Sequence, residues 1–423
     1  MGNHALGLAG IDEGKAGALL PNNLDRTKRA DRFGMLHLGL ARLVLGLVVA
    51  LIVAAALVPI RTAHDESGTA LTAMLTSQKT TNTGKHLANG APAPKTYPPI
   101  HGFVRTEADL ALYDIAITRM SRGENYYNFI VAEQRAIGYP VTPALTFRLP
   151  TLAAFSAFVT PRLLPLFSFG LLLGTVAAWW RRLAEEPRMQ HLRVTTAALL
   201  FAGGSLAINP YYLVLHEVWA GLLVALSLGL HRMSGEPGGN RWVGSLVAAA
   251  LALSIREHAL PFVLLMGAAA YYRRQWREAG AWTLLILVFL ALFSAHILVL
   301  GDQALPNERV GPGWMELRGL SGWLSNITMP SMLRLLPHWI AGPTVVLMLV
   351  GWAGWRSNLG ALVTLLQLGY ALAFAIAGRW DNFYWGLIVS PVLFIGLALA
   401  PQALRSLFAS AFPASSEQFT LAK

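Results

Sequence analysis

Long apolar runs separated by short polar segments dominate this chain. Several of them approach the ~20 residues that a helix needs to cross a lipid bilayer. The runs occupy residues 35–60, 163–180, 194–208, 217–230, 242–255, 259–272, 281–299, 332–353, 359–377 and 385–400. The pattern predicts an all-α polytopic membrane protein with a bundle of about ten transmembrane helices.

Two longer polar segments, 61–149 and 300–330, interrupt the apolar runs. In the first, apolar residues recur at helical spacing from Leu110 to Met120 and again from Tyr126 to Ile130. Neither stretch is apolar enough to span a bilayer, so we expect amphipathic helices on the membrane surface. Residues 150–159 predict a further short apolar helix.

Basic residues gather at alternate ends of the runs, as in the pairs Arg181-Arg182 and Arg273-Arg274. The positive-inside rule places such clusters in the cytoplasm. Four basic residues also precede the first run, which we expect to be an uncleaved span: Arg26, Lys28, Arg29 and Arg32. We therefore predict a cytoplasmic N-terminal tail (1–34), a membrane domain (35–400) with outer loops 61–149 and 300–330, and a cytoplasmic C-terminal tail (401–423).

Composition supports the membrane assignment and narrows the chemistry. The chain is 55% hydrophobic and 13% charged, whereas soluble domains carry about 25% charged residues. Its net charge of +11 is explained by basic residues that flank the spans, so we expect no nucleic-acid partner. The absence of cysteine excludes zinc–thiolate sites, iron–sulfur clusters and a cysteine nucleophile.

Ionisable residues at the opposite, outer helix ends are the candidates for chemistry, because such groups are costly near a membrane. In the predicted helix after Thr106, Asp109 and Tyr113 share a face, with Glu107 nearby. A partly shielded acid there could serve as a general base; the alternative is a set of solvated acids that caps a surface helix. His216-Glu217 could bind a divalent cation or orient an acid, or Glu217 could only interact with the helix dipole.

Two outer turns could bind a phosphate. Arg256-Glu257-His258 separates two apolar runs and is either an internally compensated turn or an arginine presented to an anion. Residues 378–386 combine Arg379 with other hydrogen-bonding and aromatic groups, which suit phosphate and sugar contacts but also an interfacial aromatic belt. The further candidates of this turn are Asp381, Asn382 and Tyr384. Arg148, before Pro150, either contacts a phosphate or snorkels to the interface.

The order of these features resembles the GT-C superfamily of membrane glycosyltransferases, especially the polyprenyl-phosphate-sugar-dependent members related to protein O-mannosyltransferases and aminoarabinose transferases. The resemblance rests on one span followed by the Asp109-to-Tyr113 helix, Gly123-Glu-Asn-Tyr126-Tyr127, Arg148-Leu-Pro150, an acid after the third span (Glu217) and an arginine before the last (Arg379).

The resemblance implies a GT-C-like fold in the bacterial inner membrane with its active site on the periplasmic face. A sugar would pass by inverting displacement from a polyprenyl-phosphate donor to a hydroxyl of a glycan or glycolipid acceptor, with membrane lipids around the enzyme. Asp109 would be the base, with Glu107 as substitute, and Arg256, Arg379 and Arg148 would hold the donor phosphate. The remaining expected substrate contacts are Tyr113, Tyr127, His216, Glu217, Glu257, His258, Asp381, Asn382 and Tyr384. Some relatives need a divalent metal (Mg or Mn), for which His216 and Glu217 are the candidates.

Two other functions fit parts of the pattern. An O-antigen-type polysaccharide polymerase or ligase also uses lipid-linked glycans, but it typically carries its large loop late in the chain. A secondary transporter predicts charges in the middle of the spans and broken helices in matching halves, whereas this chain has its charges at helix ends.

Overall fold

The computed structural model describes residues 31–60, 108–160, 162–186, 189–233, 235–236, 239–308 and 310–413. Within these ranges every regular element is a helix, which confirms the all-α class. The α-helices are α2 (Leu38–Leu57), α4 (Ala108–Ser121), α5 (Ile130–Ala136), α6 (Thr151–Val159), α7 (Leu164–Glu185), α8 (Arg193–Gly203), α9 (His216–Leu230), α10 (Val243–Ile255), α11 (Leu260–Tyr272), α12 (Trp276–Gly301), α13 (Gly319–Thr328), α14 (His338–Gly354), α15 (Asn358–Ile376) and α16 (Ser390–Ala411). The 3-10 turns η3 (Tyr126–Asn128), η8 (Glu257–Ala259) and η10 (Trp380–Ile388) also bear on the site.

Five of the described helices, α2, α7, α12, α15 and α16, are long and apolar enough to cross a membrane. Large apolar side chains stay exposed along them, for example Leu43 and Leu47 of α2 and Leu284 and Leu292 of α12. Such exposure is unfavourable in water and favourable in lipid. The chain is therefore an α-helical membrane protein.

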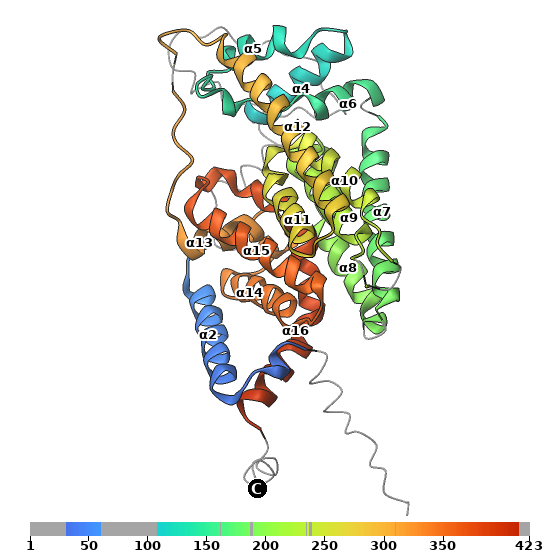
Figure 1. Ribbon diagram of the computed structural model, residues 1–423. Coiled ribbons are helices and arrows are strands. Elements are labelled where there is room, and N and C mark those ends of the chain that lie inside the picture. Colours follow the sequence, from blue (N-terminus) through green and yellow to red (C-terminus); the bar gives the residue numbers. More distant parts are fainter. Residues whose placement is uncertain are drawn as a thin grey trace, which may run out of the picture.

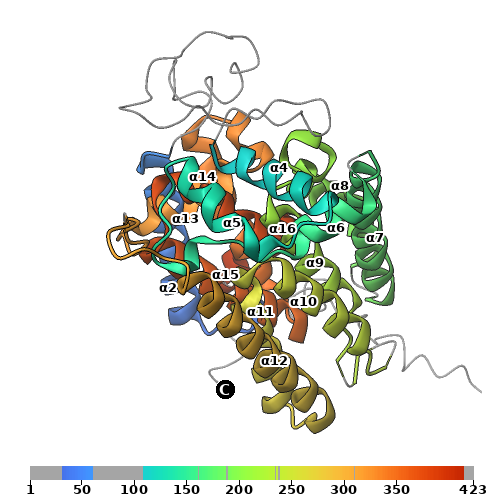
Figure 2. The ribbon, with the colours of Figure 1, turned by 90° about the horizontal axis from the view of Figure 1, so that it is seen from above.

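A layer of short helices covers one end of the bundle. α4, α5 and α6 form the top of Figure 1, and Figure 2 shows that they cross over the helices beneath them. Their apolar faces are buried, as Leu110, Ile117, Phe129 and Ile130 illustrate. The predicted helix from Leu110 to Met120 lies within α4, whereas the predicted stretch from Tyr126 to Ile130 is mainly the 3-10 turn η3, which leads into α5. We call α4–α6 the cap layer.

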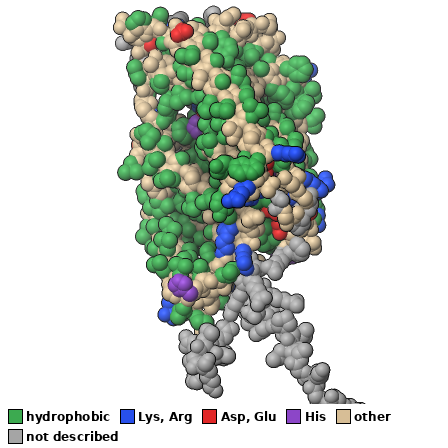
Figure 3. Space-filling model, in the orientation of Figure 1, with side chains coloured by type: hydrophobic (Ala, Val, Ile, Leu, Met, Phe, Trp, Pro, Cys, Tyr) green, Lys and Arg blue, Asp and Glu red, His purple; other side chains and the backbone are tan. Residues whose placement is uncertain are grey.

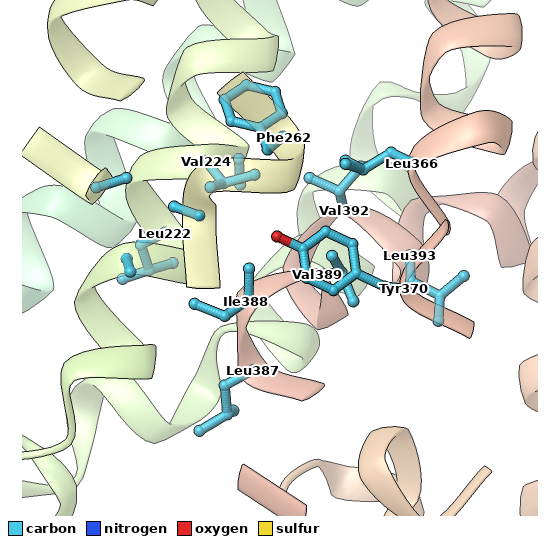
Figure 4. Packing of buried hydrophobic residues seen from close by; sticks show 14 of the residues in the cluster. Leu222, Val224, Phe262, Leu366, Tyr370, Leu387, Ile388, Val389, Val392 and Leu393 are labelled. Atoms are coloured by element: carbon cyan, nitrogen blue, oxygen red, sulfur yellow. The ribbon is translucent and has the colours of Figure 1, made fainter. Parts of the chain in front are cut away.

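Apolar side chains from four segments meet beneath this layer. Figure 4 shows Val224 of α9, Phe262 of α11, Leu366 of α15 and Leu393 of α16 converging on one core. The helices approach closely where glycine faces backbone. A Cβ on Gly221 of α9 would lie 2.0 Å from the carbonyl oxygen of Leu387. This contact lets the backbone of η10 lie directly on α9, which matters for the site below.

Several boundaries differ from the sequence prediction, and three of them change the picture of the fold. The predicted outer loop 300–330 contains α13, which is buried over most of its length. The predicted span 194–208 divides into α8 and a separate 3-10 turn, Ser205–Ile208. The last helix continues through Pro401 to Ala411, so the predicted C-terminal tail begins inside it. α16 continues because Ala403, Leu407 and Ala411 are buried, and Arg42 of α2 donates from Nε to the carbonyl oxygen of Ala411 at 3.1 Å.

The arginines that flank the runs come together at the end of the bundle away from the cap layer. Arg182 pairs with Glu236 at 3.0 Å, and Arg232 pairs with Glu185, which joins the end of α7 to the turn after α9. In Figure 3 most of the visible Lys and Arg side chains lie in the lower half, whereas hydrophobic side chains cover the left and centre of this face.

Candidate functional site

Arg148 is the central cation of a polar cluster beneath the cap layer. Its backbone is fixed because the hydroxyl of Tyr126 donates to the Arg148 carbonyl oxygen at 2.8 Å. Its guanidinium donates from Nε to the Tyr113 hydroxyl at 3.1 Å and from Nη2 to the Tyr384 hydroxyl at 3.3 Å. Within the described residues no carboxylate forms an ion pair with it. The hydrogen-bond partners of the Arg148 side chain are therefore neutral hydroxyls, and Glu217 and Glu257 interact with its charge without direct pairing.

A chain of charged groups lies beside Arg148. Glu217 lies in the first turn of α9 and forms an ion pair with Arg256, with 2.6 Å between Oε1 and Nε. The angles at these two atoms do not meet the geometry of a hydrogen bond. Arg256 Nη1 donates to Glu257 Oε1 at 2.6 Å, and that same oxygen lies 2.9 Å from His258 Nδ1. Arg256 follows α10 in an extended conformation and turns its side chain inward. Its charge is thus matched by two carboxylates.

The surroundings of Glu257 and His258 determine the charge states of these two side chains in the turn η8. Burial alone would raise the pKa of Glu257, but Arg256 and His258 hold that pKa well below its ordinary value. Burial lowers the pKa of His258, and the neighbouring Arg256 acts in the same direction. Glu257 is therefore anionic at neutral pH, and His258 is neutral.

A small pocket opens between the cap layer and the start of α9. Arg148, Tyr113 and His216 lie in its wall. Most of the other lining residues are apolar: Leu112, Ala116, Ile117, Ile130, Leu149, Leu152, Ala153 and Val214. The wall of the pocket therefore combines mostly apolar side chains with one cation, Arg148.

His216, in the wall of this pocket, has unsatisfied hydrogen-bonding groups. Its ring contacts the Tyr113 ring edge-on, with centroids 5.1 Å apart. It is 3% exposed, and neither ring nitrogen has a hydrogen-bond partner in the described part of the chain. Buried polar atoms are seldom left unpaired, so a ligand or water is expected there.

The turn η10 links the cluster to the surface. Gly221 of α9 and Gly386 allow close backbone contact on both sides of the turn, with α9 and with α13, and this brings Tyr384 to Arg148. Asn382 accepts from the backbone N–H of Arg379 at 3.2 Å. The Arg379 side chain, however, forms a partly exposed ion pair with Asp381 at 3.1 Å. Arg379 and Asp381 thus lie at the rim, outside the polar cluster.

His296 of α12 is a site residue that sequence reasoning missed. Its Nδ1 lies 3.1 Å from the hydroxyl of Tyr127, a predicted substrate contact. It also interacts electrostatically with Glu257 and with the backbone of Phe147. The sequence could have indicated His296, because a lone histidine inside a long apolar run is a candidate functional group.

The two predicted bases cannot be placed in the cluster. Glu107 lies outside the described residues, and Asp109 lies in α4 with a side chain that is not described. The metal prediction also gains no support, because among the described residues no three His, Asp or Glu side chains are grouped to hold an ion. Glu217, one of its two candidate ligands, is paired with Arg256.

Comparisons with known proteins identify no relative. No family model, no curated protein and no solved structure matches the chain. The site must therefore be interpreted from its own chemistry.

Proposed function

We propose that this protein is an integral membrane glycosyltransferase. It moves a sugar from a polyprenyl-phosphate donor to a hydroxyl of a cell-envelope glycan or lipid acceptor. The proposal places about ten spans in a bacterial inner membrane, with the N-terminus in the cytoplasm and the cap layer on the periplasmic side.

The environment of Arg148 carries the proposal. A guanidinium held by tyrosine hydroxyls, next to a mostly apolar pocket, suits a ligand that combines a phosphate with a hydrocarbon chain. Arginine binds phosphate oxygens bidentately. The two unpaired ring nitrogens of His216 in the same wall add hydrogen-bonding capacity for such a ligand.

The transfer itself needs little more than positioning and charge stabilisation. The acceptor oxygen attacks the anomeric carbon, and the bond from that carbon to the phosphate oxygen breaks, with inversion. Arg148 stabilises the negative charge that develops on the departing phosphate, an effect that is commonly the largest catalytic contribution. The resemblance gives the role of base to Asp109, with Glu107 as its substitute.

The test is transfer by the purified protein in lipid nanodiscs. Polyprenyl-phosphate hexoses and pentoses with a labelled sugar are supplied together with a membrane extract as acceptor. We expect labelled product and released polyprenyl phosphate from one of these donors. If wild-type protein consumes none of them, the proposal is wrong, and uptake of a solute into proteoliposomes without transfer would favour a transporter.

Arg148→Gln should lower kcat/KM for the donor by roughly 100-fold, because it removes the cation at the phosphate. Arg122→Gln is the matched control, since Arg122 is exposed on the same cap layer and should retain wild-type activity. Equal losses in the two variants would remove Arg148 from its assigned role.

A further inference from the structure

His258 is the most accessible member of the charged chain. The exposed fraction of the side chains is 1% for Glu217 and Arg256, 17% for Glu257 and 24% for His258. His258 is therefore the end of the charged chain at which a ligand has the best access.

The ring of His258 is fixed in one orientation. Glu257 Oε1 lies 2.9 Å from Nδ1, and an anionic carboxylate there selects the tautomer that carries its proton on Nδ1. The Trp385 ring packs on the imidazole, with centroids 4.5 Å apart, and the Tyr370 hydroxyl donates to the His258 carbonyl oxygen. Nε2 then presents a lone pair, and no described residue forms a hydrogen bond with it.

Arg256 holds the Glu257 carboxylate in the position in which it orients His258. It binds the same oxygen of Glu257 that faces His258, and Glu217 holds Arg256 in turn. Glu257 thus cannot rotate away without breaking a buried ion pair. An imidazole oriented by a carboxylate that is itself held in place is the usual construction of a general base in enzymes.

We propose that His258 accepts the proton of the acceptor hydroxyl, with Glu257 as its positioning residue. This inference rests on the proposed glycosyl transfer and assigns to His258 a role that the resemblance alone would give to Asp109. As the acceptor oxygen bonds to the anomeric carbon, its proton passes to His258 Nε2. The electron pair of the broken carbon–oxygen bond leaves with the phosphate.

Other charged groups around the ring set the range in which it can act. They are Arg256 and Glu257 of the same turn and Glu217 of α9. The neutral Tyr370 of α15 contacts the His258 backbone, and Arg148 and His296 interact electrostatically with Glu257. Arg256 opposes protonation of the imidazole, and the two glutamates favour it. Loss of Glu257 should therefore make His258 harder to protonate.

The experiment measures kcat and KM against pH for wild type, His258→Gln, Glu257→Gln and the control His191→Gln, whose histidine is exposed between α7 and α8. We expect His258→Gln to lower kcat by about 100-fold or more, with little change in donor KM, and to abolish the acidic limb of the kcat profile. Glu257→Gln should move that limb to lower pH. His191→Gln should behave as wild type.

A second variant separates chemistry from folding. Added imidazole should restore part of the activity of His258→Ala, which a misfolded protein could not regain. A wild-type acidic limb retained in His258→Gln, or activity lost only in Asp109→Asn, would overturn the role of His258 while leaving the transferase proposal intact. Absence of transfer by wild type would refute the transferase proposal itself.

Discussion

The two arginines of the polar cluster have opposite surroundings. Arg256 is buried between two carboxylates, whereas Arg148 contacts two tyrosine hydroxyls and lines a pocket. A cation whose charge is already matched has little attraction left for a phosphate. The structure therefore gives Arg256 a structural pairing with Glu217 and Glu257, and of these two arginines Arg148 is the one that we propose as the phosphate contact.

Arg256→Met should destabilise the protein by about 3 to 5 kcal/mol, because it leaves Glu217 and Glu257 buried without their counter-ion. The apparent melting temperature in detergent measures the effect. Arg379→Met is the control, since its pair with Asp381 is partly exposed and such pairs contribute about 0 to 1 kcal/mol. Similar melting temperatures for the two variants would contradict the buried ion pair.

Sequence reasoning located most of the cluster but not its internal contacts. Arg148, Glu217 and the turn at Arg256 were recognisable because ionisable residues at helix ends are conspicuous in an apolar chain. The inward orientation of the Arg256 side chain depends on how α9 packs against α10. A local sequence pattern does not contain that information. His296 escaped notice because the apolar residues around it dominate its segment.

The helices themselves follow from hydrophobic runs, and their ends depend on tertiary contacts. The ends of α9, α10 and α11 agree with the predicted runs within a residue or two. α16 extends past its predicted end because α2 and α14 cover its last turns. α13 was not predicted, since a ten-residue helix that is buried inside the protein need not have the length of a membrane span.

Close contact between α14 and α16 depends on glycine. A Cβ on Gly351 of α14 would lie 1.9 Å from the carbonyl oxygen of Gly396, so Gly351→Ala should force the helices apart and cost about 1 to 3 kcal/mol. Gly280→Ala in α12 has nothing within 4 Å of the new methyl group and should be neutral or slightly stabilising. Melting temperatures of the two variants in the same detergent test the contact, and an unchanged value for Gly351→Ala would contradict it.

Across the whole molecule, the two sets of charges that the sequence separates occupy separate ends of the bundle. Arg182, Arg232 and their acidic partners lie together at one end, and the cluster around Arg148 lies beneath the cap layer at the other. One extra or missing span in the prediction would assign every later helix end to the wrong side of the membrane. Each end of the bundle would then hold residues from both sets. Five described helices have the length and hydropathy of a full span, and the ten-span topology stays a prediction.

The absence of cysteine makes this topology directly measurable. Leu305, 58% exposed, follows α12 on the side of the cap layer, and Tyr272, 88% exposed, precedes the pair Arg273-Arg274. In spheroplasts of cells that express single-cysteine variants, Leu305→Cys should react with a membrane-impermeant maleimide, and Tyr272→Cys should react only after permeabilisation. Both should react equally in detergent, which controls for local accessibility. The reverse pattern would place the pocket and Arg148 on the cytoplasmic side, where a periplasmic transferase could not use them.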